Sequence, residues 1–146
     1  AGVAFQIKKL AIISADYEFV DYKMAKFSKA SDSYDYSNEN QGIKDILKST
    51  SNLRLGAEFR ISNIYLRGGY SYYGKAYNPN EVDKNLNYKG PSFGIGMRQK
   101  NFYFDMAYVI LSGTSKDYMY YDPGYLQPAT IKTTTNTFVT TLGFKF

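Results

Sequence analysis

The charged residues are the side chains of this chain whose types and spacing most resemble those of a catalytic or binding site. The chain has no Cys and no His, which removes thiolate metal sites and every His-based triad or metal centre. Asp16 and Glu18 share one parity of an alternating segment and have the residue types of a general acid–base pair. Cross-strand ion pairing is the simpler explanation, because lone charges in a confined interior are costly. We therefore expect no enzyme activity, catalytic residue, metal ion or cofactor.

The charged residues of the alternating segments share one parity, opposite to a mostly apolar one. Four acids and five bases nearly balance, so we expect them to form a network on the inner face of a barrel. The set is Asp16, Glu18, Arg54, Glu58, Arg60, Arg67, Arg98, Asp105 and Lys145.

Period-two alternation of apolar and polar residues recurs seven times and predicts seven strands. The predicted ranges are 2–7, 10–22, 53–61, 64–73, 92–98, 102–109 and 134–146. Short connections at 8–9, 62–63 and 99–101 alternate with long ones at 23–52, 74–89 and 110–133. Within the first long connection, Ile43, Ile46 and Leu47 have the spacing of a helical turn or two.

The composition predicts one domain, residues 1–146, with an all-β fold. No run approaches the ~18 apolar residues of a membrane-spanning helix, and the mean hydropathy is −0.42. Aromatic residues reach 18%, with 16 Tyr, and Tyr favours membrane–water interfaces. The net charge of +5 is scattered along the chain rather than gathered in a basic stripe, so we expect no nucleic-acid partner.

Alternating short turns and long loops are typical of transmembrane β-barrels of the bacterial outer membrane, where the long loops are extracellular. A soluble β-sandwich also alternates apolar and polar residues. It explains neither the alternation of connection lengths nor the aromatic content of the apolar face. We expect an antiparallel transmembrane β-barrel segment that contacts outer-membrane lipid.

The last strand carries a regular pattern of large apolar residues that ends on an aromatic one. Phe138, Leu142, Phe144 and Phe146 share one parity, and Thr140 interrupts them. The pattern resembles the β-signal by which the barrel-assembly machinery recognises outer-membrane proteins for insertion.

An odd number of strands implies either that further strands complete the barrel or that the true number of strands in the chain differs from seven by one. Bacterial single-chain barrels have even strand numbers, and an open edge in lipid would leave backbone groups unpaired. We expect the N-terminal half of the same barrel, or another chain, to supply the missing strands.

Four sequence runs, in this order, resemble the C-terminal half of the FadL/TodX family of outer-membrane transporters: ADYEFVDY at 15–22, LRLGAEFR at 53–60, LRGGY at 66–70 and TLGFKF at 141–146. The resemblance implies half of a fourteen-stranded barrel, in a parent protein that takes up hydrophobic compounds of the long-chain fatty acid or aromatic type. The plug and the kinked strand of that family have no counterpart in the chain.

Loop aromatics are the candidates for contacting a hydrophobic small-molecule ligand, with interface anchoring as the other explanation; they are Tyr73, Tyr77, Tyr118 and Tyr121. An outer-membrane scaffold or binding barrel without transport activity, such as a secretion-system component, is the alternative function. A lipid-modifying barrel enzyme is a third reading, which the absence of His disfavours.

Overall fold

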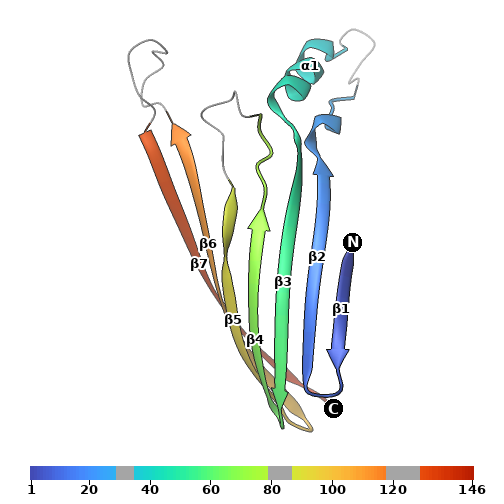
Figure 1. Cartoon of the computed structure of the whole chain (residues 1–146), viewed down its shortest axis with the longest axis vertical. Helices are drawn as coiled ribbons and strands as arrows, with labels where there is room; N and C mark the ends of the chain where they lie inside the picture. Colours follow the sequence, from blue (N-terminus) through green and yellow to red (C-terminus); the bar gives the residue numbers. More distant parts are fainter. Residues whose placement is uncertain (29–34, 79–86, 118–128) are drawn as a thin grey trace.

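The computed structural model describes residues 1–28, 35–78, 87–117 and 129–146 as a single antiparallel sheet. Its seven strands lie side by side in chain order, and each pairs with the next (Figure 1). The sheet is not closed, because β1 and β7 each have one neighbour. The strands are β1 (Gly2–Ile7), β2 (Ala11–Asp21), β3 (Ser49–Ile61), β4 (Ile64–Tyr73), β5 (Tyr88–Arg98), β6 (Phe102–Asp117) and β7 (Ala129–Phe144). The predictions of an all-β fold and of seven strands are confirmed.

The connections alternate in length as predicted, with tight turns at one end of the sheet and long connections at the other (Figure 1). Lys8 and Ser62 take the left-handed backbone conformation, with φ of 50° and 56°, as tight turns require. The turns are staggered along the sheet. Ala11 is opposite Phe59, two residues before the end of β3, whereas Met97 is opposite Phe104, two residues after the start of β6.

Four of the predicted strands are longer than the sequence analysis had them. β3 begins at Ser49 rather than Leu53, and β5 begins at Tyr88. The third long connection was wrong in extent, since β6 runs on to Asp117 and β7 begins at Ala129. The extensions of β3, β6 and β7 are rich in Ser and Thr on both faces and show no apolar alternation, although Thr favours strands. The strands of this hairpin are paired along 16 residues each, and the pairing continues through the part where side-chain patterning gives no signal.

The first long connection contains a 3-10 turn, η1 (Tyr22–Met24), and one helix, α1 (Ser37–Ile46). The helix starts earlier than predicted and ends before Leu47, which is extended and bridges to Tyr77. The Asn40 side chain holds Phe27 by two hydrogen bonds, from Phe27 N to Oδ1 at 2.7 Å and from Nδ2 to Phe27 O at 3.1 Å. No helix in the described ranges is both long enough and apolar enough to cross a membrane.

The two faces of the sheet differ in chemistry. The face that carries Ile13, Leu55, Ile95 and Phe138 is here called the apolar face, and the opposite one the charged face. Large apolar side chains on the apolar face are exposed, with Phe5 at 66% and Phe138 at 61%. In the described part of the chain, Ala11 is the only buried hydrophobic residue. The described residues therefore form one layer without a hydrophobic core of its own.

The apolar face is free of charge along most of its height but not at the end that bears the long connections. Asp21, Lys89 and Lys132 have the apolar parity and lie at the end of the sheet that bears the long connections. The expectation of an uncharged parity therefore holds only below them.

Residues 112 and 134 test the unpredicted part of the β6–β7 hairpin. The hydroxyl oxygens of Ser112 and Thr134 lie 3.1 Å apart on paired positions. We expect the S112C/T134C double variant to form a disulfide on mild oxidation, because the two sulfur atoms start close to bonding distance. Mass spectrometry after thiol blocking measures it, in a chain segment that has no native Cys.

S112C/T130C is the matched control, since Thr130 lies on the same face but is paired with Lys116. Oxidation of the control as fast as the test pair would contradict the register of β6 and β7.

Candidate functional site: an ion-pair network on the charged face

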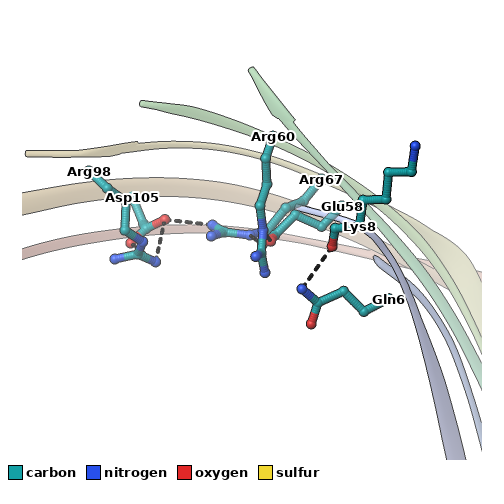
Figure 2. Close-up of polar contacts among 7 residues, drawn as sticks. All are labelled: Gln6, Lys8, Glu58, Arg60, Arg67, Arg98 and Asp105. Carbon is teal, nitrogen blue, oxygen red and sulfur yellow. Dashed lines mark hydrogen bonds and ion pairs between the residues drawn. The ribbon is translucent and has the colours of Figure 1, made fainter. Parts of the chain in front are cut away.

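Two carboxylates near the tight-turn end of the charged face are each shared between two arginines. Glu58 on β3 accepts from Arg60 Nε at 2.7 Å and from Arg67 Nε on β4 at 2.6 Å. Asp105 on β6 accepts from Arg67 Nη1 and lies 3.1 Å from Arg98 Nη2 on β5. Arg67 thus joins the two carboxylates, and the network spans four strands (Figure 2). We call these five residues the lower cluster.

Strand register places these residues together. Glu58 is directly opposite Arg67, and Asp105 is opposite Gly96. Figure 2 shows the side chains projecting from the inner side of the curved sheet, with Asp105 and Glu58 on either side of the Arg67 guanidinium. The carboxylates are the less exposed partners, at 18% for Glu58 and 19% for Asp105. The arginines therefore form the outer layer of the cluster.

Tyr65 and Tyr103 add aromatic surfaces beneath the arginines. The guanidinium carbons of Arg60 and Arg98 lie 5.4 Å and 5.3 Å from the centroid of the Tyr65 ring. Arg98 also lies 4.9 Å from the centroid of Tyr103. These distances fall within the range of cation–π attraction, so the rings hold the arginines in place as the carboxylates do.

A second, more open cluster lies nearer the long connections. Arg54 Nη2 is 3.0 Å from Asp16 Oδ1 and 3.4 Å from Glu18 Oε2. The Asn52 amide donates to the same Glu18 oxygen at 3.0 Å. The Asp16 side chain is 50% exposed, and exposed pairs contribute little to stability. Asp16 and Glu18 are joined through Arg54, as expected for structural charges.

Glycine on the charged face makes room for the lower cluster. A Cβ added at Gly96 would lie 2.3 Å from Asp105 Oδ1 and 3.2 Å from Arg67 Nη1. At Gly143 it would lie 2.2 Å from the Tyr103 ring. Sequence reasoning assigned no role to Tyr65, Tyr103 or Gly143. Their common parity with the charged residues was the available signal.

Between the two clusters the charged face forms a hollow of about 480 Å³. Small and aliphatic residues line most of it, among them Ile12, Ser14, Ala107, Val109 and Val139. Glu58, Arg67 and Asp105 border it on the side of the lower cluster. The hollow can take an apolar group of modest size.

The other predicted residues are placed apart from these clusters. Lys145 shares the parity of the network, but it makes no ion pair with the described residues. The four residues of the C-terminal aromatic pattern are exposed; they are Phe138, Leu142, Phe144 and Phe146. Phe144 is opposite Phe102 and Leu142 is opposite Phe104.

The candidate ligand-contacting tyrosines do not form one group. Tyr73 is the last residue of β4 and is opposite Asn52 and Tyr88 on the charged face. Tyr77 bridges to Leu47 beside α1. Tyr118 and Tyr121 lie outside the described residues.

Asp35 lies in the connection before α1. Its carboxylate accepts from Ser37 N at 3.2 Å and from Ser37 Oγ at 2.6 Å. These hydrogen bonds favour the ionised form and lower the pKa of Asp35. Within the described ranges, no group of three or more Asp and Glu residues is arranged to hold a metal ion.

No family model, curated protein or solved structure matches the chain. The resemblance to FadL/TodX transporters therefore stays a prediction.

Gly96 offers a direct test of the lower cluster. We expect G96A to lower the free energy of unfolding by about 1–3 kcal/mol, because the new methyl group displaces Asp105 and leaves two arginines without their carboxylate. Equilibrium urea unfolding measures the change.

G68A is the matched control, since a Cβ at Gly68 on the apolar face of β4 meets nothing within 4 Å. It should be neutral or slightly stabilising. Equal losses in the two variants would mean that glycine itself matters at both positions and that room for Asp105 does not.

Proposed function

We propose that the chain is a segment of a transmembrane β-barrel in the bacterial outer membrane, with the apolar face against lipid. The observation that carries the proposal is the exposure of that face together with the absence of a second layer among the described residues. Val3, Phe5, Ile13, Leu55, Phe93 and Phe138 are between 47% and 66% exposed. A water-facing patch of that extent is rare in soluble proteins and needs a cover.

The height of the uncharged band supports lipid as that cover. On the apolar face the runs without charge are 11–19 in β2, 49–61 in β3, 64–72 in β4, 91–97 in β5, 102–114 in β6 and 134–144 in β7. They span seven to thirteen residues, a range that includes the length of a tilted strand crossing the hydrocarbon layer. The runs in β2, β5 and β7 end at Asp21, Lys89 and Lys132.

We further propose that the parent barrel admits hydrophobic compounds through its interior. The supporting observation is the hollow between the two clusters, whose lining is mostly small and aliphatic. The two ion-pair clusters on either side of it together comprise four arginines and four carboxylates, so the charges of the clusters cancel. A non-transporting scaffold or binding barrel is the alternative.

The two faces can be distinguished with lipid-borne quenchers. Single Cys residues at 55, 95 and 106 on the apolar face, and at 71, 92 and 141 on the charged face, each carry a fluorophore in the complete barrel. We expect brominated acyl chains to quench the first set and spare the second. Equal quenching on both parities, or none, would remove the membrane barrel and favour a soluble β domain.

Transport is tested by filling the hollow. We expect A107W to slow uptake of a hydrophobic fluorescent compound into vesicles containing the complete barrel several-fold, because Ala107 lines the hollow and an indole occupies it. A15W places the same side chain on the apolar face, at a position outside the lining of the hollow, and should leave uptake unchanged. Uptake no faster than in barrel-free vesicles would favour the scaffold.

A further inference from the structure

The net charge of the chain is concentrated at one end of the sheet. The ion-pair clusters hold four arginines and four carboxylates, which cancel. The long connections, residues 22–48, 74–87 and 118–128, contain seven lysines and seven acids, which also cancel. Of the total of +5, four charges remain at the tight-turn end, on Lys8, Lys9, Lys100 and Lys145. We call these four the turn-end lysines.

The turn-end lysines form two pairs without a neighbouring acid in the turns. Lys8 and Lys9 are adjacent in the β1–β2 turn. Lys145 N donates to Asn101 O at 2.8 Å, which places Lys145 beside the turn that holds Lys100. Residues 8–10, 62–63, 99–101 and 145–146 contain no Asp or Glu. Two doublets of positive charge therefore lie on the same rim.

The four side chains are open to a partner. All four residues are exposed, and none forms an ion pair with the described residues. The carbonyl of Lys8 accepts from Gln6 Nε2 at 2.8 Å, which holds the turn, while its ammonium group points away from the lower cluster (Figure 2). The turn-end lysines are thus separate from the ion-pair network.

We propose that the turn-end lysines bind the phosphodiester headgroups of anionic phospholipids in the leaflet at the tight-turn end. The inference rests on the proposed membrane barrel and adds a lipid preference on one side of it. Lys8 follows Ile7, which is 50% exposed, and Lys145 follows Phe144, which is 65% exposed. The lysines therefore lie where the apolar band ends, which is the level of the headgroups.

Charge and side-chain length favour lipid phosphate over other anions. Lys stems extend along apolar surface and place the ammonium group at the interface, and basic residues at that level attract anionic lipids. Four strands separate the β1–β2 turn from the β5–β6 turn, a spacing of about 19 Å. Each doublet therefore serves its own headgroup, and loss of one should leave the other intact.

The test uses the complete barrel in bilayer nanodiscs, with a fluorophore on a single Cys at position 99, next to Lys100. One sample contains brominated phosphatidylglycerol in phosphatidylcholine, and a second contains brominated phosphatidylcholine at the same fraction. We expect the anionic lipid to quench several-fold more than the zwitterionic lipid, and the preference to fall at high salt. In K100Q/K145Q the preference should disappear.

K8N/K9Q is the matched control, because it removes the same charge from the same rim about four strands away. Asn is chosen at position 8 because it tolerates the left-handed backbone there. The control should keep the preference at position 99. Folded fractions are compared by heat-dependent gel mobility, so that lost assembly is recognised.

Equal quenching by both lipids in the unsubstituted barrel would overturn the headgroup site. The turn-end lysines would then be better explained as a binding surface for an acidic protein. An unchanged preference in K100Q/K145Q would overturn the assignment to these lysines. Absence of quenching by either lipid, at position 99 and on the apolar face alike, would instead remove the membrane barrel itself.

Discussion

Every part of this structure depends on the period of two that an extended backbone imposes on its side chains. Once β2 to β7 are paired in register, alternate residues are committed to opposite faces. Here one face carries the ion pairs and the other carries large apolar side chains. In a single layer, neither face is covered by other parts of the sheet. Backbone hydrogen bonding sets the arrangement, but the sheet needs an environment that covers the apolar face. The polar interactions of the chain are therefore on one face of the sheet and its apolar surface is on the other.

On the charged face, single ions are shared between more than one partner. Arg67 contacts two carboxylates, and each of those carboxylates contacts a second arginine. The tyrosine ring at position 65 supports three guanidinium groups. Such sharing lowers the number of polar groups left without a partner, and none of the buried side-chain polar atoms in the described residues is unsatisfied. The cost is dependence on a few small residues, of which Gly96 is the clearest.

The sequence predicts the central part of every strand because apolar alternation is strong there, as at Leu53 to Ile61. It does not predict the upper β6–β7 hairpin, where Ser112 and Thr134 on one face and Thr133 on the other make both faces polar and backbone pairing alone decides. The charged set could be predicted from parity, whereas its partners could not. Which arginine meets Asp105 depends on register between β4, β5 and β6, and register is a property of pairs of strands. Lys145 lies outside the network because β7 ends at Phe144, one residue before it.

The stagger of the turns has a consequence for how the strands are oriented. From the β1–β2 turn to the β5–β6 turn, the tight-turn end of the sheet advances by about one residue per strand. Ala11 is level with Phe59, and β3 continues for two residues beyond that level. Met97 is level with Phe104, and β6 starts two residues beyond that level. A rise of about 3.3 Å per residue against a strand spacing of about 4.8 Å corresponds to an incline of about 35°. If the turns lie in one plane, the strands lean from its normal by that angle. This incline falls at the lower end of the range of strand tilts found in closed β-barrels.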